Sequence, residues 1–371
     1  LTALASRVNA RFAFLFTLLI YLSIGPCLAI PRTASTSFEM VMRPALEGAG
    51  LLEAAFGGFS ALGLAQFVYS ILFFALAYAV ALNPEKLTQR LGKFLCPTLI
   101  ALIALLFLGI CLHPLGDAAA PTGAYAQGAF ATGFIEGYQT MDTIAALNFG
   151  LVIAMNIRAF GIRSEGTVVK ETVFAGAIAA CVFFAVYGAL AVIGAEAGGA
   201  YSSMENGAQT LTLVASDLFG PVGTVLMGLI FFIACFNTCV GLISSVGQYF
   251  HELMHLPYPA VAAFFAVTSM LISNLGLAGI IRLSTPVLNA VYPIAIVLIA
   301  LSFAPFAAKK SAVWPLTIAC TAVQSVCAAL PLGPLSALAN ALPFSSLGFG
   351  WLLPAAAGLL LGLVLPQAEK A

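Results

Sequence analysis

Residues 133–154 of this chain read GFIEGYQTMDTIAALNFGLVIA. The stretch has the length of a membrane-spanning helix, about 20 residues, yet it carries Glu136, Asp142 and several glycines where lipid favours leucine. A helix that enters the membrane near Gly133 places Asp142 roughly 13 Å deep, close to the middle of a hydrocarbon core of about 30 Å. An ionisable residue there costs about 2.5–3.5 kcal/mol on insertion scales, and it therefore indicates a functional site.

The composition places this stretch in a membrane protein. Of the 371 residues, 62% are hydrophobic and 8% are charged, whereas about 25% of residues are charged in soluble domains. The 14 basic and 14 acidic residues balance, and no basic run suggests a surface for nucleic acid. The eight cysteines contain no C-x-x-C pair, which favours packing over disulfides or metal binding. We therefore predict an all-α polytopic membrane protein that binds no nucleic acid.

Apolar runs of spanning length predict ten transmembrane helices. The runs are 12–30, 64–82, 94–112, 133–155, 173–194, 223–247, 258–275, 285–306, 312–330 and 347–365. Residues 1–10 contain no initiating Met, basic region or cleavage site, so we expect no signal peptide and an internal start.

The distribution of Lys and Arg predicts that both ends of this chain are cytoplasmic. With ten spans and the N-terminus inside, only Arg32, Arg43 and Arg282 lie outside. The cytoplasmic set is Arg7, Arg11, Lys86, Arg90, Lys93, Arg158, Arg163, Lys170, Lys309, Lys310 and Lys370. This excess agrees with the retention of basic residues on the cytoplasmic side of membranes.

A second polar stretch, GPCLAIPRTASTSFE at residues 25–39, follows the first apolar run. Pro26 and Pro31 each remove a backbone donor and loosen the helix. One interpretation is a helix end at the outer interface, where Arg32 and Glu39 form a solvated pair. The other is a polar lining near a substrate path, because loosened backbone at membrane depth is tolerated only inside protein or beside a cavity.

The sixth run, 223–247, carries hydroxyl groups on one helical stripe. Thr238 and Ser245 are seven residues apart, and Ser244 lies on the adjoining face. Such hydroxyls could bind a sodium ion together with carbonyls of a partner helix. Equally, small hydroxyl residues in membrane helices often serve close helix packing, and the residues alone do not separate these two interpretations.

A competing motif, HELMH, follows this run, with His251, Glu252 and His255 in the pattern of zinc metalloproteases. A catalytic zinc needs a third protein ligand, but the only carboxylate after the motif is Glu369. Pro257 also follows directly. We therefore interpret the motif as an interfacial helix end and keep an intramembrane zinc protease as an alternative.

Two motifs, PRTASTSFE at 31–39 and GYQTMDTIAALNFG at 137–150, resemble signature segments of the bacterial branched-chain amino acid:cation symporters, the LIVCS family of BrnQ type. A looser similarity covers the rest of the chain, including FIAC at 232–235 and SNLGL at 273–277. The family pattern does not predict His251 and His255.

The resemblance implies a sodium-coupled importer of leucine, isoleucine and valine in the bacterial inner membrane, working by alternating access. It implies no enzymatic activity and no cofactor other than sodium as coupling ion. The implied fold is the inverted-repeat amino-acid transporter fold of the APC superfamily. Members have about twelve spans, so we expect residues 1–371 to form one transporter domain that lacks the first two spans, and with them one broken helix of the substrate site.

The resemblance and the residues together give a candidate site. We expect segment 136–142 to unwind near Gly137, so that backbone groups and Thr140 contact the charged ends of the amino acid. Tyr138 and Met141 would border its aliphatic side chain. The candidate substrate residues are Gly137, Tyr138, Thr140, Met141, Asp142, Gly25 and Pro26; the candidate cation ligands are Thr238, Ser244 and Ser245; the candidate structural polar residues are Arg32, Glu39 and Glu136.

Asp142 could be a cation ligand, a partner for Arg32 or an anchor of the unwound segment, and we favour the last two together. A non-transporting, truncated membrane protein is the remaining alternative. The sequence does not decide between sodium and protons, the preferred amino acid or the oligomeric state.

Overall fold

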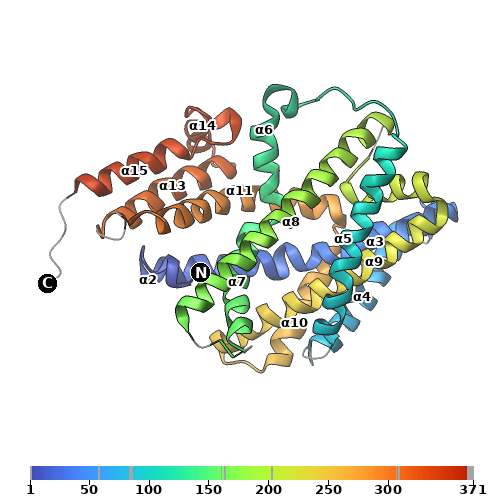
Figure 1. Ribbon diagram of the computed structural model, residues 1–371, viewed down its shortest axis with the longest axis horizontal. Coiled ribbons are helices and arrows are strands. Elements are labelled where there is room, and N and C mark those ends of the chain that lie inside the picture. Colours follow the sequence, from blue (N-terminus) through green and yellow to red (C-terminus); the bar gives the residue numbers. More distant parts are fainter. Residues whose placement is uncertain are drawn as a thin grey trace. The chain divides into compact units, whose positions relative to one another are not determined.

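The computed structural model describes residues 2–365 except 57–58, 83–86, 160, 163, 202–203, 306 and 308–309. At 55–56, 59, 87–95, 148–149, 151–152, 155–156 and 159 only the backbone is described. Nearly all regular structure in the described part is helical, as predicted (Figure 1). The elements are α1 (Thr2–Ala5), α2 (Ala10–Leu22), η1 (Ser23–Cys27), α3 (Ala29–Gly48), β1 (Ala55–Phe56), β2 (Phe59–Ser60), α4 (Ala61–Ala81), α5 (Leu87–Leu112), α6 (Ala124–Glu136), η2 (Gly137–Thr140), α7 (Asp142–Ala159), α8 (Glu165–Ala200), α9 (Gly207–Met254), α10 (Tyr258–Ser273), α11 (Gly276–Ser302), α13 (Val313–Ala329), α14 (Pro334–Asn340), η3 (Ser345–Leu347) and α15 (Leu352–Val364).

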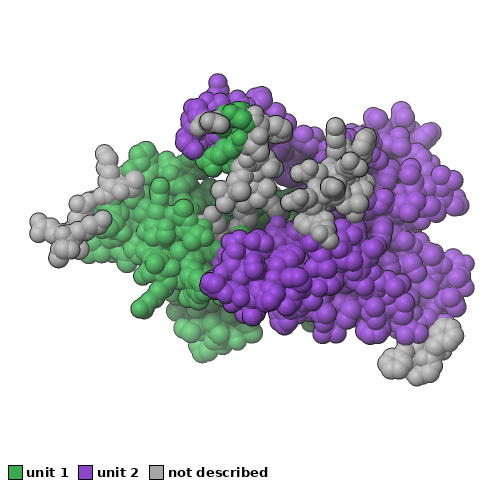
Figure 2. All heavy atoms as spheres, turned by 90° about the horizontal axis from the view of Figure 1, so that it is seen from below, with its two compact units in different colours: residues 1–23, 121–163, 281–371 green, residues 24–120, 164–280 purple. Residues whose placement is uncertain are grey.

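The chain forms two compact units, coloured separately in Figure 2. Unit 1 comprises residues 1–23, 121–163 and 281–371, and unit 2 comprises residues 24–120 and 164–280. Each unit therefore gathers segments that are far apart in the sequence.

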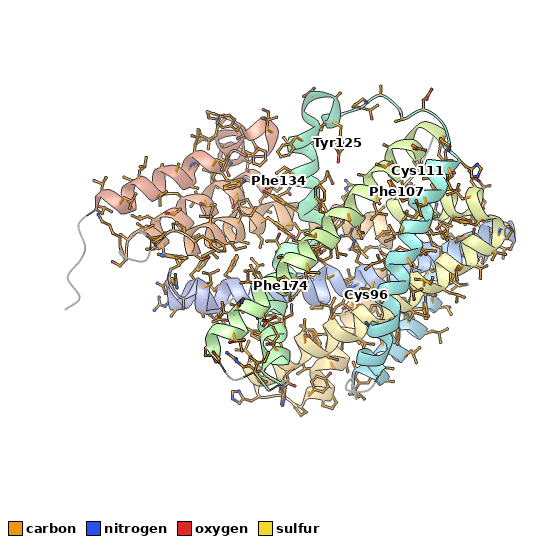
Figure 3. The ribbon with its side chains drawn as sticks, in the orientation of Figure 1. Cys96, Phe107, Cys111, Tyr125, Phe134 and Phe174 are labelled. Carbon is orange, nitrogen blue, oxygen red and sulfur yellow. The ribbon has the colours of Figure 1, made fainter. Side chains whose placement is uncertain are left out.

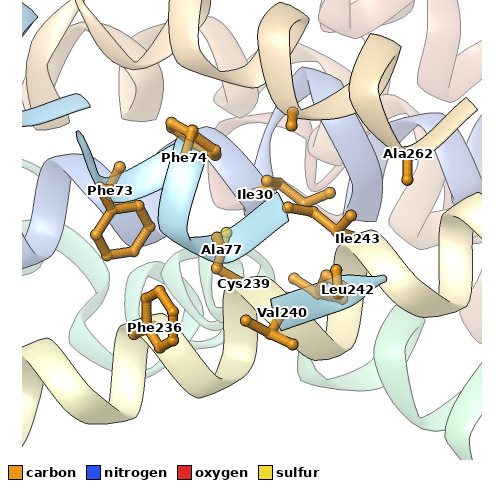
Figure 4. Packing of buried hydrophobic residues seen from close by; sticks show 13 residues of the cluster. Ile30, Phe73, Phe74, Ala77, Phe236, Cys239, Val240, Leu242, Ile243 and Ala262 are labelled. Carbon is orange, nitrogen blue, oxygen red and sulfur yellow. The ribbon is translucent and has the colours of Figure 1, made fainter. Parts of the chain in front are cut away.

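The core of unit 2 is an apolar cluster contributed by α3, α4, α9 and α10 (Figure 4). Phe73 packs edge-on against Phe74 and Phe236, with ring centroids 5.5 and 5.7 Å apart. Small residues such as Ala77 and Ala262 are fully buried in the same cluster. Their size lets the helix backbones approach closely, which is how helices associate in an apolar solvent.

The first predicted run, 12–30, is longer in the structure than the sequence indicated. After the irregular turn η1 the chain continues as α3 to Gly48. Pro31 is the third residue of α3, where backbone N–H groups have no intrahelical acceptor, so proline is tolerated. The stretch 31–39 is thus helical and does not end a helix at an interface.

Hydroxyl and amide side chains hold the junction between α10 and α11 in unit 2. The carbonyl of Ser273, the last residue of α10, accepts hydrogen bonds from Ser35 Oγ at 2.9 Å and Gln66 Nε2 at 2.6 Å. Asn274 donates to Ser70 Oγ at 3.1 Å. These bonds replace the helical partners that the chain loses where it turns, at the left-handed Gly276.

In unit 1, α13 and α15 lie side by side, with α14 at their end (Figure 1). A Cβ atom placed on Gly358 of α15 would lie 2.6 Å from the Leu316 carbonyl oxygen, and one on Gly362 would lie 2.6 Å from the Val313 Cα atom. Only glycine permits this approach. α13 and α14 are bent by 112° across a short break, so they form a broken span or a re-entrant loop.

Five stretches of the described residues are long and apolar enough to cross a membrane, or six if α13 and α14 form one span. They are Ala10–Gly48, Ala61–Ala81, Glu165–Ala200, Gly207–Met254 and Gly276–Ser302. Three further apolar helices are shorter: Cys96–Leu112, Tyr258–Ser273 and Leu352–Val364. Each of the ten predicted runs overlaps a helix, but the count of ten spans stays a prediction.

Apolar side chains cover much of the outside of these helices. Phe174 on α8 is 63% exposed, and Cys96 and Cys111 on α5 are exposed (Figure 3). Soluble proteins rarely show such extended apolar surfaces, so a lipid environment explains them. The predicted sidedness also uses Lys86, Arg163, Lys309 and Lys370, which lie outside the described residues.

The contact between α3 and α9 gives a test of the unit 2 packing. A Cβ atom on Gly228 of α9 would lie 2.9 Å from the Met40 carbonyl oxygen, whereas Gly188 of α8 has no neighbour within 4 Å of its Cβ position. We expect Gly228→Ala to lower the apparent melting temperature in detergent by about 2–8 °C, because overpacking costs about 1–3 kcal/mol. Gly188→Ala should leave it unchanged or raise it slightly. Equal melting temperatures for the two variants would contradict the close α3–α9 approach.

Candidate functional site

The stretch at 133–154 is a broken helix in unit 1. α6 ends at Glu136, the tighter 3₁₀ turn η2 runs from Gly137 to Thr140, and α7 begins at Asp142. The change of helix type at Gly137 agrees with the predicted unwinding there. Thr140 Oγ1 donates a 2.8 Å hydrogen bond to the Gly137 carbonyl, so a side chain satisfies backbone that a regular helix would have paired.

The direction of the chain changes at Met141, which the sequence reasoning did not single out as the break. Met141 has φ 62° and ψ 9°, a left-handed conformation that is uncommon for a residue with a side chain. Its side chain is buried, which holds this conformation in place. Asp142 is the first residue of α7, where a carboxylate interacts favourably with the helix dipole. Its role as an anchor of the segment stays a prediction.

Of the predicted substrate residues in this segment, Tyr138 lines a cavity. It is 4% exposed, and its ring stacks on Tyr292 of α11 with centroids 4.5 Å apart. The adjoining cavity, about 200 Å³, is lined by residues of α6, η2, α11, α13, α14 and η3 and by the loop that leads into α15. We call it the unit 1 cavity. Gly137, Thr140 and Glu136 are exposed.

Sequence reasoning missed the partners of Tyr138 in this cavity. Asn289 and Gln324 lie in the apolar runs 285–306 and 312–330, and Trp351 lies in 347–365. A polar side chain inside an apolar run was the available signal. It was not sufficient, because nothing in the sequence places these three runs against residue 138.

The predicted residues Gly25 and Pro26 form a second break, at the start of unit 2. Gly25 has non-helical dihedral angles, φ −90° and ψ −127°. Both residues are buried, and a Cβ atom on Gly25 would lie 3.0 Å from a methyl group of Val246. Ser269 Oγ donates to the Pro26 carbonyl at 3.5 Å. The break is therefore packed against α9 and α10.

The polar residues of α3 take different positions from those expected for an Arg32–Glu39 pair. Glu39 binds Arg43, with Oε2 3.0 Å from Nη1, and the same nitrogen lies 2.8 Å from Glu205 Oε2. The Arg43 hydrogen bond holds the pKa of the Glu205 carboxyl below its usual value. Arg32 instead lies within electrostatic range of Tyr187 and Cys235. One of the two interpretations of this stretch paired Arg32 with Glu39; the structure shows Glu39 paired with Arg43, one helical turn away.

The predicted cation ligands Thr238 and Ser245 both lie on the exposed side of α9, and Ser244 is half-buried. Thr238 Oγ1 donates to the Ala234 carbonyl at 2.9 Å, and Ser244 Oγ donates to the Val240 carbonyl at 2.8 Å. A donating hydroxyl keeps oxygen lone pairs for a cation. The arrangement thus leaves both interpretations of the stripe open.

The zinc alternative loses support in the structure. α9 ends at Met254, and His255 adopts a left-handed conformation with φ 57°. His251 Nδ1 lies 2.5 Å from the Leu256 carbonyl oxygen, and Glu252 accepts a hydrogen bond from Gln248. Within the described part of the chain, no three His, Cys, Asp or Glu side chains gather as a metal site would require.

The predicted site residues fall into the two units. Segment 136–142 belongs to unit 1, whereas Gly25, Pro26, Arg32, Glu39 and the three hydroxyl residues of α9 belong to unit 2. A site shared by these two groups, including an Asp142–Arg32 pair, stays a prediction.

Comparison with known proteins tests the family. A family model described as branched-chain amino acid transport protein matches residues 1–369. The branched-chain amino acid permease BrnQ of Bacillus subtilis is 36% identical, with 98% of this chain and 82% of the permease covered. The branched-chain amino acid permease BraB of the same organism is 37% identical, with 98% of this chain and 81% of the permease covered. The branched-chain amino acid transport system 2 carrier protein of Pseudomonas aeruginosa is 35% identical, with 97% of this chain and 81% of the carrier covered.

No solved structure matches the chain, so the comparisons do not assign a transporter fold by likeness. They also do not support the prediction that the first two spans are missing. The match nevertheless spans both polar motifs, both broken helices and nearly every other residue. On this evidence the chain is a member of the branched-chain amino acid transport protein family.

Proposed function

We propose that this protein carries branched-chain amino acids across a membrane. The observation that carries the proposal is the break at residues 137–141, where α helix gives way to a 3₁₀ turn and a left-handed residue. Irregular backbone of this kind, inside an apolar helical protein, is characteristic of transporter binding sites. The relatives named above are permeases and carriers of branched-chain amino acids.

The substrate chemistry suits this setting. Leucine, isoleucine and valine have apolar side chains, and burial of such a side chain contributes about 1.5–3 kcal/mol. In the proposed site Met141 borders the side chain, and the backbone near Gly137 and Thr140 contacts the charged ends. Gly25 and Pro26 are the proposed second half of the site. We expect weak discrimination among the three amino acids, since one methylene contributes only about 1–3 kcal/mol.

Sodium is the proposed coupling ion, with Thr238, Ser245 and Ser244 of α9 as its ligands. The support is chemical: sodium prefers oxygen ligands, and two of these hydroxyls donate to their own helix, which leaves lone pairs free. The proposed fold is the inverted repeat of the APC superfamily, and the proposed location is a bacterial inner membrane with both ends of this chain cytoplasmic.

Reconstitution of the full chain into proteoliposomes tests the function. We expect leucine to accumulate when sodium is higher outside, and isoleucine and valine to compete. If a proton gradient without sodium drives leucine accumulation equally well, protons rather than sodium are the coupling ion. Absence of any leucine uptake by correctly folded protein would favour the non-transporting alternative and refute the proposal.

Asp142→Asn tests the anchoring role of this carboxylate. We expect leucine uptake to fall roughly tenfold, because charge-assisted hydrogen bonds contribute about 1.5–3 kcal/mol. Asp217→Asn is the matched control: Asp217 is an exposed residue of α9 that accepts a hydrogen bond from Tyr201, and its amide should support normal uptake. Full uptake with unchanged sodium dependence in Asp142→Asn would remove Asp142 from the mechanism.

Thr238→Ala tests the sodium ligand. We expect the apparent sodium affinity to fall about fivefold, from the loss of one oxygen ligand worth about 1 kcal/mol. Thr268 of α10 is half-buried and also donates to the carbonyl four residues earlier, at 2.8 Å, so Thr268→Ala controls for the loss of such a bond. If Thr238→Ala and Thr268→Ala have the same apparent sodium affinity, Thr238 is not a ligand of the cation.

A further inference from the structure

The unit 1 cavity contains buried polar atoms without hydrogen-bond partners. Among the described residues these atoms include the Tyr138 hydroxyl, Asn289 Oδ1 and Trp351 Nε1, and all three residues line the cavity. Tyr138 is 4% exposed and Trp351 is 7% exposed. The Trp351 indole and the Tyr138 hydroxyl are neighbours that interact, but neither atom has a partner at hydrogen-bond geometry. Buried polar groups in proteins are almost always hydrogen-bonded, so these three atoms around one cavity indicate a missing ligand.

Three other polar side chains around the cavity are already engaged in hydrogen bonds. Gln324 Nε2 and Ser345 Oγ both donate to the Ala339 carbonyl, at 3.4 and 3.1 Å. Ser325 Oγ donates to the Ala290 carbonyl at 2.9 Å. A Cβ atom on Gly350 would lie 2.1 Å from Ser345 Oγ, so the wall is closely packed. The unpartnered atoms are therefore not the result of a loosely built region.

The three unpartnered atoms differ in hydrogen-bonding character. The indole N–H of Trp351 is a donor only, the amide oxygen of Asn289 is an acceptor only, and the Tyr138 hydroxyl can be either. The Tyr138 ring is covered by Tyr292 and by Phe134, whose centroid lies 5.7 Å away. Its hydroxyl, rather than its ring, is thus the group that it offers to a ligand.

The charge of the lining limits the kind of ligand. None of the residues that the structure places around the cavity is charged. A ligand with a net charge would remain uncompensated in a buried site, which is costly. A bare cation would also face the donor of Trp351. A zwitterion has zero net charge and presents one acceptor group and one donor group, which complements the donor and acceptor of the cavity.

We propose that the unit 1 cavity binds the head group of the transported amino acid. Trp351 Nε1 and the Tyr138 hydroxyl donate to its carboxylate, and Asn289 Oδ1 accepts from its ammonium group. This assignment rests on the proposed function. It extends the substrate site from the segment 137–142 to α11 and to the loop that leads into α15, and it gives Tyr138 a polar role instead of an apolar one. The apolar wall at Pro293 and Ala328 faces the rest of the ligand.

The test compares leucine with two analogues in the purified full chain. Leucinol keeps the ammonium group but lacks the carboxylate, and 4-methylpentanoate keeps the carboxylate but lacks the ammonium group. We expect Trp351→Phe to weaken leucine binding roughly tenfold and leucinol binding less than about threefold. Asn289→Leu removes the acceptor for the ammonium group, so it should lower the affinity for leucine more than the affinity for 4-methylpentanoate. A purely structural role would weaken leucine and the analogue equally.

The chain provides a matched control because it contains two tryptophans. Trp314 of α13 is also buried in unit 1, but its Nε1 donates to the Ala307 carbonyl at 3.0 Å, and it does not line the cavity. Trp314→Phe should bind leucine with wild-type affinity. In that variant Trp351 is the sole indole, so its fluorescence should shift on addition of leucine. In Trp351→Phe the remaining indole should show no shift at saturating leucine.

The outcomes separate this inference from the proposed function. If wild-type protein neither binds nor transports leucine, the proposed function fails. If it transports leucine but Trp351→Phe keeps both the affinity and the preference over leucinol, only the head-group assignment fails, and the cavity is a water site. Unchanged Trp351 fluorescence in a leucine-transporting Trp314→Phe protein would refute the assignment even if Trp351→Phe fails to fold.

Discussion

In an apolar solvent, backbone N–H and C=O groups have no water to bind, so every irregular segment must find its partners within the protein. The structure depends on this constraint at each break. Thr140 bonds the Gly137 carbonyl beside Met141, and Ser269 bonds the Pro26 carbonyl in η1. Two side chains from α3 and α4 bond the carbonyl that ends α10. Hydroxyl and amide residues in apolar helices thus make it possible for the helices to be broken.

Close contact between helices is the second requirement, because lipid chains are as apolar as the side chains that they surround. Glycine meets it in both units. Gly228 brings α9 against the backbone of α3 in unit 2, and Gly358 and Gly362 bring α15 against α13 in unit 1. These contacts leave little room for adjustment, so each unit is a stable support for its own break. Many other bulky apolar residues are exposed on the outside of the helices, as expected for a surface that faces lipid.

The candidate site shows where sequence reasoning succeeds and where it stops. Asp142 and its neighbours were found because a carboxylate inside an apolar run is costly and therefore informative. The change of helix at Gly137 followed from local sequence. The left-handed conformation of Met141 was harder to predict from the sequence, because methionine has no intrinsic preference for it and burial holds the residue there. The pairing of Glu39 with Arg43, one turn beyond it on the same helix, was not among the predictions from sequence.

By itself, the sequence determined the all-helical membrane class, the two polar motifs and the family, since composition, apolar run length and local motifs are properties of neighbouring residues. Only the tertiary structure decided that η1 continues into α3 as far as Gly48, and that Tyr138, Asn289 and Trp351 surround one cavity. In the sequence, Tyr138 and Trp351 lie far from Asn289 on either side and still farther from each other. Their meeting depends on side-chain packing between α6, α11, α13 and α15, and no local pattern in the sequence encodes which helices pack together.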